Sequence, residues 1–521
     1  MNLRVLLVTG LLAEKTVKDS AQQSFVETRV FTLNTQVAAL LTPERIAEAL
    51  GNLNDREFDV ILIPGLTRGD ASVIAEKTGI STFKGPKYAA DLPTVLESLG
   101  KVKLSTVTPA CDILREELHR KAMQELEAVE KNKIVLLKKP GNMLIKELAI
   151  GKAFPMRVMA EIVDAPLMSV DEIQGLARKY VELGADIIDV GMLAGESKPS
   201  EAKRIVGAVK SAVNAPVSID TLDPDEIAGA VSTGADIVLS VDAGNIEKVA
   251  PYASDVAVVV IPSNQSEGYF PKKSEDRVAF LEELIRRAGR LGMKKIIADL
   301  ILDPSNVMES MVAFRDFANR NPDVPLFVGV SNVTELIDAD SIGVNALLAR
   351  LSSEVGASIL LATEKSNKAK GSVKEEVAAS KMMFLAKKRS SVPKDLGLDL
   401  LVLKDKRVQE EQYDVEIEVN TSVVQTTEKP KATVMETDRT FKIILDRNEG
   451  RIVAILFTDG QIDSPKTIIK GTTAESVYGK ILELDLISKL DHAAYLGSEL
   501  AKAEIALRTG KNYIQDSPLF K

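Results

Sequence analysis

The stretch that decides the fold is GADIIDVG, residues 184–191, a short apolar run that ends on Asp189 and a glycine. Similar β-branched runs recur before and after it, most of them separated by amphipathic segments with helical spacing. They occupy residues 156–163, 186–190, 216–220, 236–241, 256–261, 295–300, 326–330 and 358–362. About eight such units in about 240 residues are the number and length of a (β/α)8 TIM barrel. The sequence therefore predicts a TIM barrel over residues 150–395.

Functional side chains of a TIM barrel lie where its strands end. The polar residues that end or follow the predicted strands are Glu161, Asp189, Asp220, Ser240, Asp242, Ser263, Asn264, Asp299, Ser331, Asn332 and Glu364. Together they predict a pocket rich in acceptors, suited to a ligand with N–H donors. Each could instead cap the following helix. Asp189 and Asp220 are the strongest candidates, because they close apolar strands and a buried carboxylate needs a partner.

The flanking segments predict two further domains, which gives an α/β fold class overall. Residues 1–145 alternate apolar runs with helical patterns and predict a parallel α/β domain of the Rossmann or flavodoxin-like kind. Residues 404–440 are polar and predict a linker with one possible edge strand near 415–419. Residues 441–521 contain a hairpin pattern and two helical patterns, and predict a small α+β domain.

Composition excludes several classes of site. The chain has 521 residues, a net charge of −9, one cysteine and two histidines. Disulfides and cysteine- or histidine-rich metal centres are therefore not expected. Carboxylates spread over separate strands lack the compact spacing of a metal-binding loop, so no metal is predicted. The acidic balance disfavours nucleic acid, and no apolar run is long enough for a membrane span, so we expect a cytoplasmic protein.

One apolar run raises the question of self-association. Met382, Met383, Phe384 and Leu385 are consecutive in a predicted helix of the barrel. One helix face cannot bury all four against the barrel. A homodimer would cover the remainder, and burial under a terminal domain is the equal alternative.

The barrel motifs resemble a known superfamily. GADIIDVG, GESKP at 195–199 and PVSIDT at 216–221 are similar to the second and third strands of the pterin-binding barrels. That superfamily includes dihydropteroate synthase and the cobalamin-linked methyltetrahydrofolate methyltransferases. GVSNV at 329–333 is similar to the methyltransferase branch. The resemblance implies a reduced pterin as ligand.

The resemblance also implies roles for individual residues. Asp220 and Asp299 would accept hydrogen bonds from the amino-pyrimidine edge, and Asn332 would approach the reacting nitrogen as the catalytic residue. Further pterin contacts are implied for Asp189, Ser240 and Ser331. Glu161, Asp242, Asn264 and Glu364 are possible pocket residues. A helix N-cap is the alternative role for Asn332.

Departures from the synthases leave the enzyme class open. Where synthases carry Ser-Arg-Lys and Arg-Val-His runs, this chain has Ser331-Asn332-Val333 and Ala362-Thr363-Glu364. Cations that would hold a diphosphate leaving group are missing at these positions. If catalytic, the chain is expected to be a transferase, either dihydropteroate-synthase-like or pterin-dependent methyltransferase-like.

The C-terminal sequence carries a second resemblance. DHAAYLG at 491–497 and YIQD at 513–516 are similar to one component of the tetrahydromethanopterin S-methyltransferase of methanogens. With the barrel, this arrangement resembles the archaeal dihydropteroate-synthase-related proteins. It implies tetrahydromethanopterin biosynthesis or methyl transfer, with a corrinoid methyltransferase as possible partner. The alternative is a non-catalytic pterin or one-carbon-carrier binding protein that recruits a partner. His492 is either a cobalt ligand or, more simply, a packed helix residue.

Overall fold

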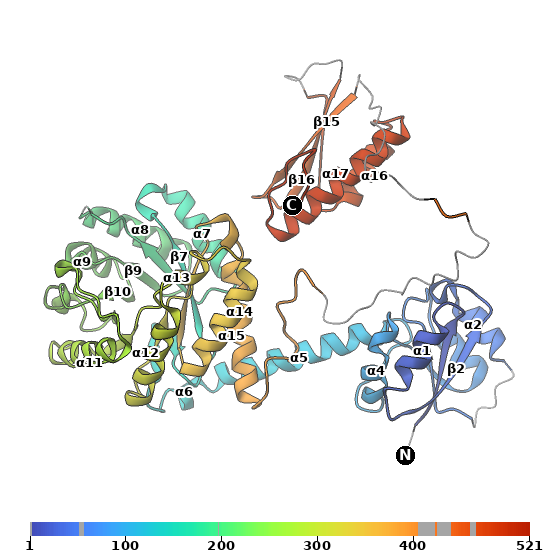
Figure 1. Cartoon of the computed structure of the whole chain (residues 1–521), viewed down its shortest axis with the longest axis horizontal. Coiled ribbons are helices and arrows are strands. Elements are labelled where there is room, and N and C mark those ends of the chain that lie inside the picture. Colours follow the sequence, from blue (N-terminus) through green and yellow to red (C-terminus); the bar gives the residue numbers. More distant parts are fainter. Residues whose placement is uncertain are drawn as a thin grey trace. The chain divides into compact units, whose positions relative to one another are not determined.

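The computed structural model describes residues 3–51, 57–195, 197–404, 422–424, 439–458 and 465–520. The edge strand predicted near 415–419 lies outside these residues. Contacts divide the chain into two compact units, the first running to Leu401 and the second containing the C-terminal sheet (Figure 1). Among the described residues, no helix combines the length and apolarity that a membrane span needs.

The first unit begins with a four-stranded parallel sheet, as the alternating pattern predicts. Its strands follow the order β2-β1-β3-β4. They are β1 (Arg4–Gly10), β2 (Glu27–Leu33), β3 (Val60–Ile63) and β4 (Ser81–Lys84). The accompanying helices are α1 (Glu14–Ala21), α2 (Pro43–Ala49), α3 (Ser72–Thr78) and α4 (Leu92–Ser98). Both faces of the sheet are buried, with one apolar cluster around Ile61 and another around Leu62.

A long helix leads from this sheet to the barrel. It is α5 (Ala110–Lys131), followed by α6 (Lys133–Leu136) and the antiparallel hairpin β5 (Met143–Ile145) and β6 (Leu148–Ile150). Ile145 and Ile150 are buried in one cluster with inward-facing residues of the barrel strands, such as Met159 and Ile187. The hairpin therefore closes the N-terminal end of the barrel.

The eight parallel strands confirm the predicted TIM barrel. They are β7 (Arg157–Ile162), β8 (Ile187–Gly191), β9 (Val217–Asp220), β10 (Ile237–Val241), β11 (Ala257–Val260), β12 (Lys295–Ala298), β13 (Phe327–Val328) and β14 (Ile359–Thr363). The hydrogen-bonded order is β12-β11-β10-β9-β8-β7-β14-β13. A parallel bridge between Ala298 and Leu326 joins β12 to the start of β13 and closes the ring.

Helices cover the outside of the barrel, and two of them start with side-chain caps. They are α7 (Val170–Glu182), α8 (Pro199–Ala212), α9 (Pro224–Ser232), α10 (Ile246–Val249), α11 (Ser274–Arg290), α12 (Val307–Arg320), α13 (Ser331–Thr334), α14 (Ser341–Val355) and α15 (Ser372–Lys388). Ser169 and Glu172 form a capping box at α7. The Asp223 carboxylate accepts the first backbone N–H groups of α9.

Alternation along the strands separates the inside of the barrel from its helix-facing side. Val158 and Ala160 face the helices, whereas Met159 belongs to the inner cluster closed by the hairpin. Because strand side chains alternate, Glu161 continues the inner series of β7 and Asp189 continues that of β8 after Ile187. The inside of the barrel is thus apolar near the hairpin and polar at the opposite, C-terminal end.

The apolar run of α15 is covered within the chain. Met382 and Leu385 pack with Ala122 and Leu126 of α5, and Phe384 packs partly against the same cluster. Arg389 and Glu125 add an ion pair at 2.8 Å. The burial that motivated a homodimer is therefore supplied by α5, so this run no longer argues for a dimer.

The second unit is an antiparallel sheet with two helices, as predicted. Its elements are β15 (Arg439–Asp446), β16 (Arg451–Thr458), β17 (Thr467–Gly471), α16 (Ala474–Glu483) and α17 (Leu490–Thr509). His492 of α17 is 2% exposed, with its ring 6.0 Å from that of Phe441 and 6.4 Å from that of Tyr495. It is therefore a packed residue of this unit's core.

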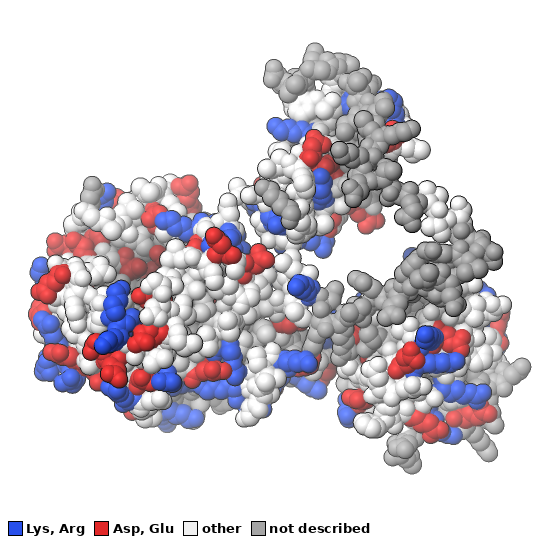
Figure 2. Space-filling model, viewed as in Figure 1, with Lys and Arg blue, Asp and Glu red and all other residues white. Residues whose placement is uncertain are grey.

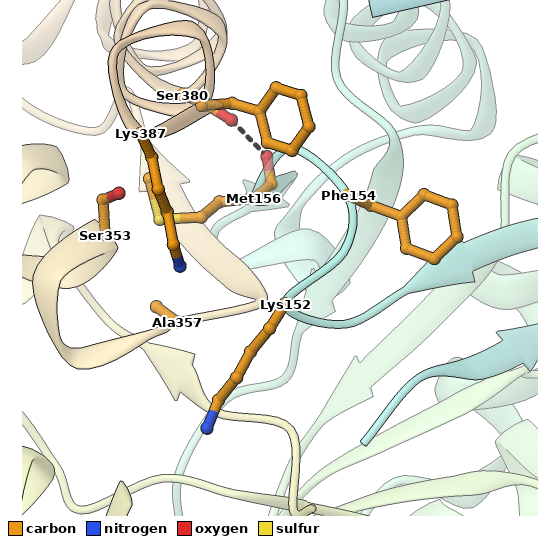
Figure 3. A pocket seen from close by; sticks show the side chains of 8 residues that line it. Lys152, Phe154, Met156, Ser353, Ala357, Ser380 and Lys387 are labelled. Atoms are coloured by element: carbon orange, nitrogen blue, oxygen red, sulfur yellow. Dashed lines mark hydrogen bonds between the residues drawn. The ribbon is translucent and has the colours of Figure 1, made fainter. Parts of the chain in front are cut away.

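The barrel has a surface of mixed charge and a small pocket at its hairpin end. On the face drawn in Figure 2, Lys and Arg alternate with Asp and Glu over the barrel. Figure 3 shows a pocket at the hairpin end, where Lys152 and Lys387 lie near Met156, whose carbonyl accepts from Ser380 Oγ at 2.5 Å. Its volume of about 20 Å³ holds little more than one water molecule. A ligand the size of a pterin therefore needs the other end of the barrel.

Candidate functional site

Three acidic side chains from neighbouring strands meet inside the C-terminal end of the barrel. We call Glu161, Asp189 and Asp220 the carboxylate triad; one oxygen from each lies within 4.8 Å of those of the other two. Strand register explains the meeting, since Glu161 pairs with Asp189 and Asp220 pairs with Gly191, two residues beyond Asp189. Residues two apart face the same side of a strand. The predicted strand-end positions are thus brought together for these three residues.

Asp189 is the most deeply placed member of the triad. It is fully buried, and neither of its carboxylate oxygens has a hydrogen-bond partner among the described residues. The hydroxyl of Ser218, its register partner on β9, is equally buried and close enough to lower the pKa of Asp189, but it does not reach the geometry of a well-formed hydrogen bond. An unpaired buried carboxylate is costly, because folding removes its hydration without replacing it. The site is therefore built for something that supplies the missing partner.

The other two members each accept one hydrogen bond. Thr363 Oγ1 donates to Glu161 Oε2 at 3.2 Å, and Ser240 Oγ donates to Asp220 Oδ1 at 2.7 Å. Burial, together with the charge of Asp220, raises the pKa of Glu161 to about 7. Burial likewise raises the pKa of Asp220, and burial with the two neighbouring carboxylates raises that of Asp189 well above its usual value. The triad thus resists carrying three negative charges.

A bulge in β10 aims Ser240 at the triad. The register of β10 against β11 shifts between Val238 and Val241, and Ser240 has a left-handed backbone with φ of 64°. Such a conformation is unfavourable for serine, and bulges re-aim side chains near functional sites. The Asn245 amide stabilises it by donating to the Ser240 carbonyl at 3.1 Å. Ser240 is therefore placed to fix one oxygen of Asp220.

Asp299 lies directly after β12 at the same end of the barrel and is 7% exposed. Its Oδ1 accepts from the backbone N–H of Ile301 at 2.8 Å. Burial raises the pKa of Asp299 to about 7, with the charge of Asp220 adding to the rise. Asp299 and Asp220 are thus close enough to influence each other, and each keeps one oxygen without a hydrogen bond among the described residues.

Arg277 of α11 supports the loop that carries Asp299. Its side chain is fully buried and donates to the Leu300 carbonyl at 3.2 Å and the Ile301 carbonyl at 3.0 Å. The guanidinium also lies over the Phe270 ring, 4.6 Å from its centre. Ile301 itself has a positive φ of 61°. Arg277 therefore holds a strained loop in place beside the pocket.

Ser331 and Asn332 belong to the short helix α13. Ser331 ties the start of α13 to β14, because its hydroxyl donates to the Leu361 carbonyl at 3.0 Å and accepts from the Thr363 N–H at 2.6 Å. Asn332 Nδ2 donates to the Leu302 carbonyl at 3.4 Å. The N-cap of α13 is Val330, without a side-chain cap. The structure therefore does not support the alternative that Asn332 acts as a helix cap.

Three predicted pocket residues have structural roles instead. Asp242 accepts from the N–H of Gly244 and of Gln265, at 2.8 and 2.7 Å, and so organises the loop after β10. Asn264 Oδ1 accepts from Ser266 Oγ at 2.7 Å within its own loop. Glu364 Oε1 accepts the N–H of Gly371 at 3.1 Å and of Val373 at 3.3 Å, at the start of α15.

An acidic residue at position 364, where the synthases carry a cation, would be expected from the sequence to repel a diphosphate, and the structure corrects this expectation. Its neighbour Thr363 faces the triad, so Glu364 points to the helix side, where Lys179 pairs with it at 3.5 Å. It therefore does not repel a bound diphosphate.

A cavity lies beside this group of residues. It has a volume of about 370 Å³ and is lined by Ser263, Gln265, Gly268, Tyr269, Phe270 and Ile301. Its walls come from the loops after β11 and β12, at the end of the barrel that carries Asp299. The size falls within the range of small-molecule sites, and the aromatic walls suit a flat ring.

Sequence reasoning missed Thr363 and Arg277. Alternation along the last strand could have singled out Thr363, because it is two residues after the inward-facing Leu361. Arg277 lies on a helix that carries many charges, and nothing in its local sequence distinguishes a buried arginine from an exposed one.

Sequence comparison matches each part of the chain to a known family. Residues 163–365 match the family described as pterin binding enzyme. Residues 437–516 match the family named PterinBD-DUF4346, and residues 3–87 match a family of unknown function, DUF6513. The predicted resemblance of the C-terminal part to a methyltransferase component is not among these matches and stays a prediction.

The chain is also similar to proteins along its whole length or in its barrel. The uncharacterized protein MJ0107 of Methanocaldococcus jannaschii is 42% identical over 537 residues, which cover 99% of each chain. Among solved structures, dihydropteroate synthase of Xanthomonas albilineans is 18% identical, with a TM-score of 0.40, over 49% of this chain and 100% of its own. That of Stenotrophomonas maltophilia is 19% identical, with a TM-score of 0.39, over 47% and 97%.

These structural similarities are low, so the assignment rests on the sequence matches. The relative spans the full chain at high identity, and the pterin-binding match covers the barrel. The chain therefore belongs to the family of the Methanocaldococcus protein, and its central TIM barrel matches the family described as pterin binding enzyme.

Proposed function

We propose that the barrel binds a reduced pterin at its C-terminal end through Asp220 and Asp299. The observation that carries this proposal is that the two carboxylates have the same pattern of hydrogen bonding. Each is fixed by one hydrogen bond to Oδ1 and keeps its second oxygen for a ligand. A pterin presents N–H donors along its amino-pyrimidine edge, and paired acceptors suit paired donors.

The neighbouring groups support the same ligand. Ser240 orients Asp220, and the aromatic cavity beside Ile301 suits a flat ring system. Asn332 Nδ2 makes a single long hydrogen bond to Leu302, so its second N–H is available to a ring nitrogen. Asn332 is therefore the residue that would donate to the reacting nitrogen of the pterin.

The biological role we propose is one-carbon transfer with tetrahydromethanopterin or a related pterin, with a corrinoid methyltransferase as partner. Support comes from the Ser331-Asn332 pair, which stands where a synthase would carry cations for diphosphate. A role in tetrahydromethanopterin biosynthesis and a non-catalytic carrier role are the alternatives. Methyl transfer would give a demethylated pterin from a methylated one, and biosynthesis would give a pteroate product from a diphosphorylated pterin. A carrier role would give neither product.

Binding can be measured by isothermal titration calorimetry with a panel of reduced pterins. Asp220→Asn and Asp299→Asn should each lower affinity, since a charge-assisted hydrogen bond contributes about 1.5–3 kcal/mol, roughly tenfold to a hundredfold in affinity. Asp255→Asn is the matched control, because Asp255 is exposed ahead of β11 at the hairpin end. Wild-type affinity in both site variants would refute the assignment.

A further inference from the structure

The carboxylate triad has more negative charge than its protein neighbours can offset. Among the described side chains, the well-formed hydrogen bonds to it come from the hydroxyls of Thr363 and Ser240, one to Glu161 and one to Asp220, while Ser218 is a weaker neighbour of Asp189. No lysine or arginine in the described part of the chain forms an ion pair with any of the three. The positive charge of Lys365 acts on Glu161 from a distance, and Lys365 is itself paired with Asp164 at 2.9 Å.

Asp189 adds a second, independent observation. It is fully buried, belongs to the group of oxygens that lie within 4.8 Å of one another, and leaves both oxygens without a partner among the described residues. An acidic cluster alone could be solvated, but a completely buried carboxylate is out of reach of bulk water. It is stabilised either by taking up a proton or by a positive charge or donor that enters the space between the three side chains, and the close approach of three carboxylates favours a cation.

We propose that Glu161, Asp189 and Asp220 bind one divalent cation of the oxygen-preferring kind, Mg²⁺ or Mn²⁺. Carboxylate oxygens are the ligands that these ions choose, and three carboxylates leave the other coordination positions for water or a ligand oxygen. Separation in sequence conceals the site, because the ligands come from β7, β8 and β9 and meet only in the closed barrel.

The cation site can be tested separately from the pterin proposal. The cation proposal rests on Glu161, Asp189 and Asp220, the pterin proposal above rests on Asp220 and Asp299, and Asp220 is the residue that the two share. A cation bound between the three side chains would offset the repulsion between carboxylates whose oxygens lie within 4.8 Å of one another.

The test is isothermal titration of the chelator-treated full chain with MnCl₂, with Glu161→Gln and Asp189→Asn as site variants. Wild-type protein should bind one equivalent, and each variant should bind at least about tenfold more weakly, since even outer-shell changes cost about 10–100-fold. Asp164→Asn removes a neighbouring carboxylate outside the triad and should leave affinity within about twofold. Asp299→Asn should keep Mn²⁺ binding while losing pterin affinity.

Thermal unfolding shows whether a variant that binds the cation weakly is still folded. Without added cation, Asp189→Asn should melt at or above the wild-type temperature, because it removes a buried charge without changing the side-chain shape. Mn²⁺ should raise the melting temperature of wild type but not of this variant. Absence of saturable binding by wild type up to about 10 mM would overturn the proposal, as would unchanged binding in the site variants. Proton uptake by the triad without cation binding would equally overturn it.

Discussion

Glu376 offers a sharp test of how the barrel tolerates a buried acid. It lies on the core face of α15 between Val373 and Ser380, is fully buried, and has no hydrogen bond to either oxygen among the described residues. Burial raises the pKa of Glu376 well above its usual value, and the charge of Glu375 adds to the rise. The side chain therefore stays protonated in the folded protein when it would ionise in the unfolded chain.

The sign of the pH effect follows from this difference. Because the folded-state pKa of Glu376 is the higher one, its stability contribution is complete below the unfolded pKa and is lost as pH rises toward the folded pKa. One pH unit corresponds to 1.36 kcal/mol when the group is fully ionised in the unfolded chain. Between pH 5 and pH 6, where ionisation of the unfolded group is nearly complete, Glu376 should cost about 1 kcal/mol of unfolding free energy.

Glu376→Gln should remove this loss, since the amide has a similar shape and no charge to bury. Differential scanning calorimetry of the full chain at pH 5, 6 and 7 would follow the barrel transition. The variant should gain stability over wild type as pH rises. Glu354→Gln, on an exposed side chain of α14 paired with Arg350, is the matched control for the same replacement at a site that is not buried. A pH-independent difference for Glu376→Gln would refute the reasoning.

Three further predictions concern the packing and the pocket. Leu385→Ala should lower stability by about 2–5 kcal/mol, because the side chain is fully buried under α5; an unchanged calorimetric transition would contradict that packing. Arg277→Met should lower both the melting temperature and pterin affinity, since hydrogen bonds to charged groups contribute about 1.5–3 kcal/mol each; unaltered affinity would separate this residue from the loop of Asp299. Asn332→Ala should leave the melting temperature nearly unchanged and lower pterin affinity, as the side chain caps no helix; the reverse result, by thermal shift and calorimetry, would favour a structural role.

The repeated strands of the barrel could be predicted because they are locally encoded. Each run such as 186–190 is apolar, β-branched and bounded by helical spacing, and burial on both faces of a parallel strand requires that composition. The hairpin Met143–Ile150 was not predicted. Its strands are three residues long, and their purpose, to cover the inner cluster, exists only once the barrel has closed.

The site could be predicted only as a set of strand ends. Glu161, Asp189 and Asp220 were among the expected positions, but their meeting depends on register across three strands. Glu364 and Thr363 are adjacent in sequence and face opposite sides of the wall. A difference of one residue separates a carboxylate that accepts the N–H groups at the start of α15 from a threonine that donates to the triad. Alternation from Leu361 distinguishes the two, but only when that residue is known to face inward.

The hairpin that closes one end of the barrel determines where a ligand can enter and leave. Ile145 and Ile150 close the N-terminal end of the barrel with apolar side chains, so the C-terminal end is the one open to a molecule bound among the inner residues. A ligand bound among the inner residues therefore enters and leaves at the C-terminal end, and a long substituent on a bound ring would extend outward there. We therefore expect that, when two ligands bind, the one nearer the hairpin binds first.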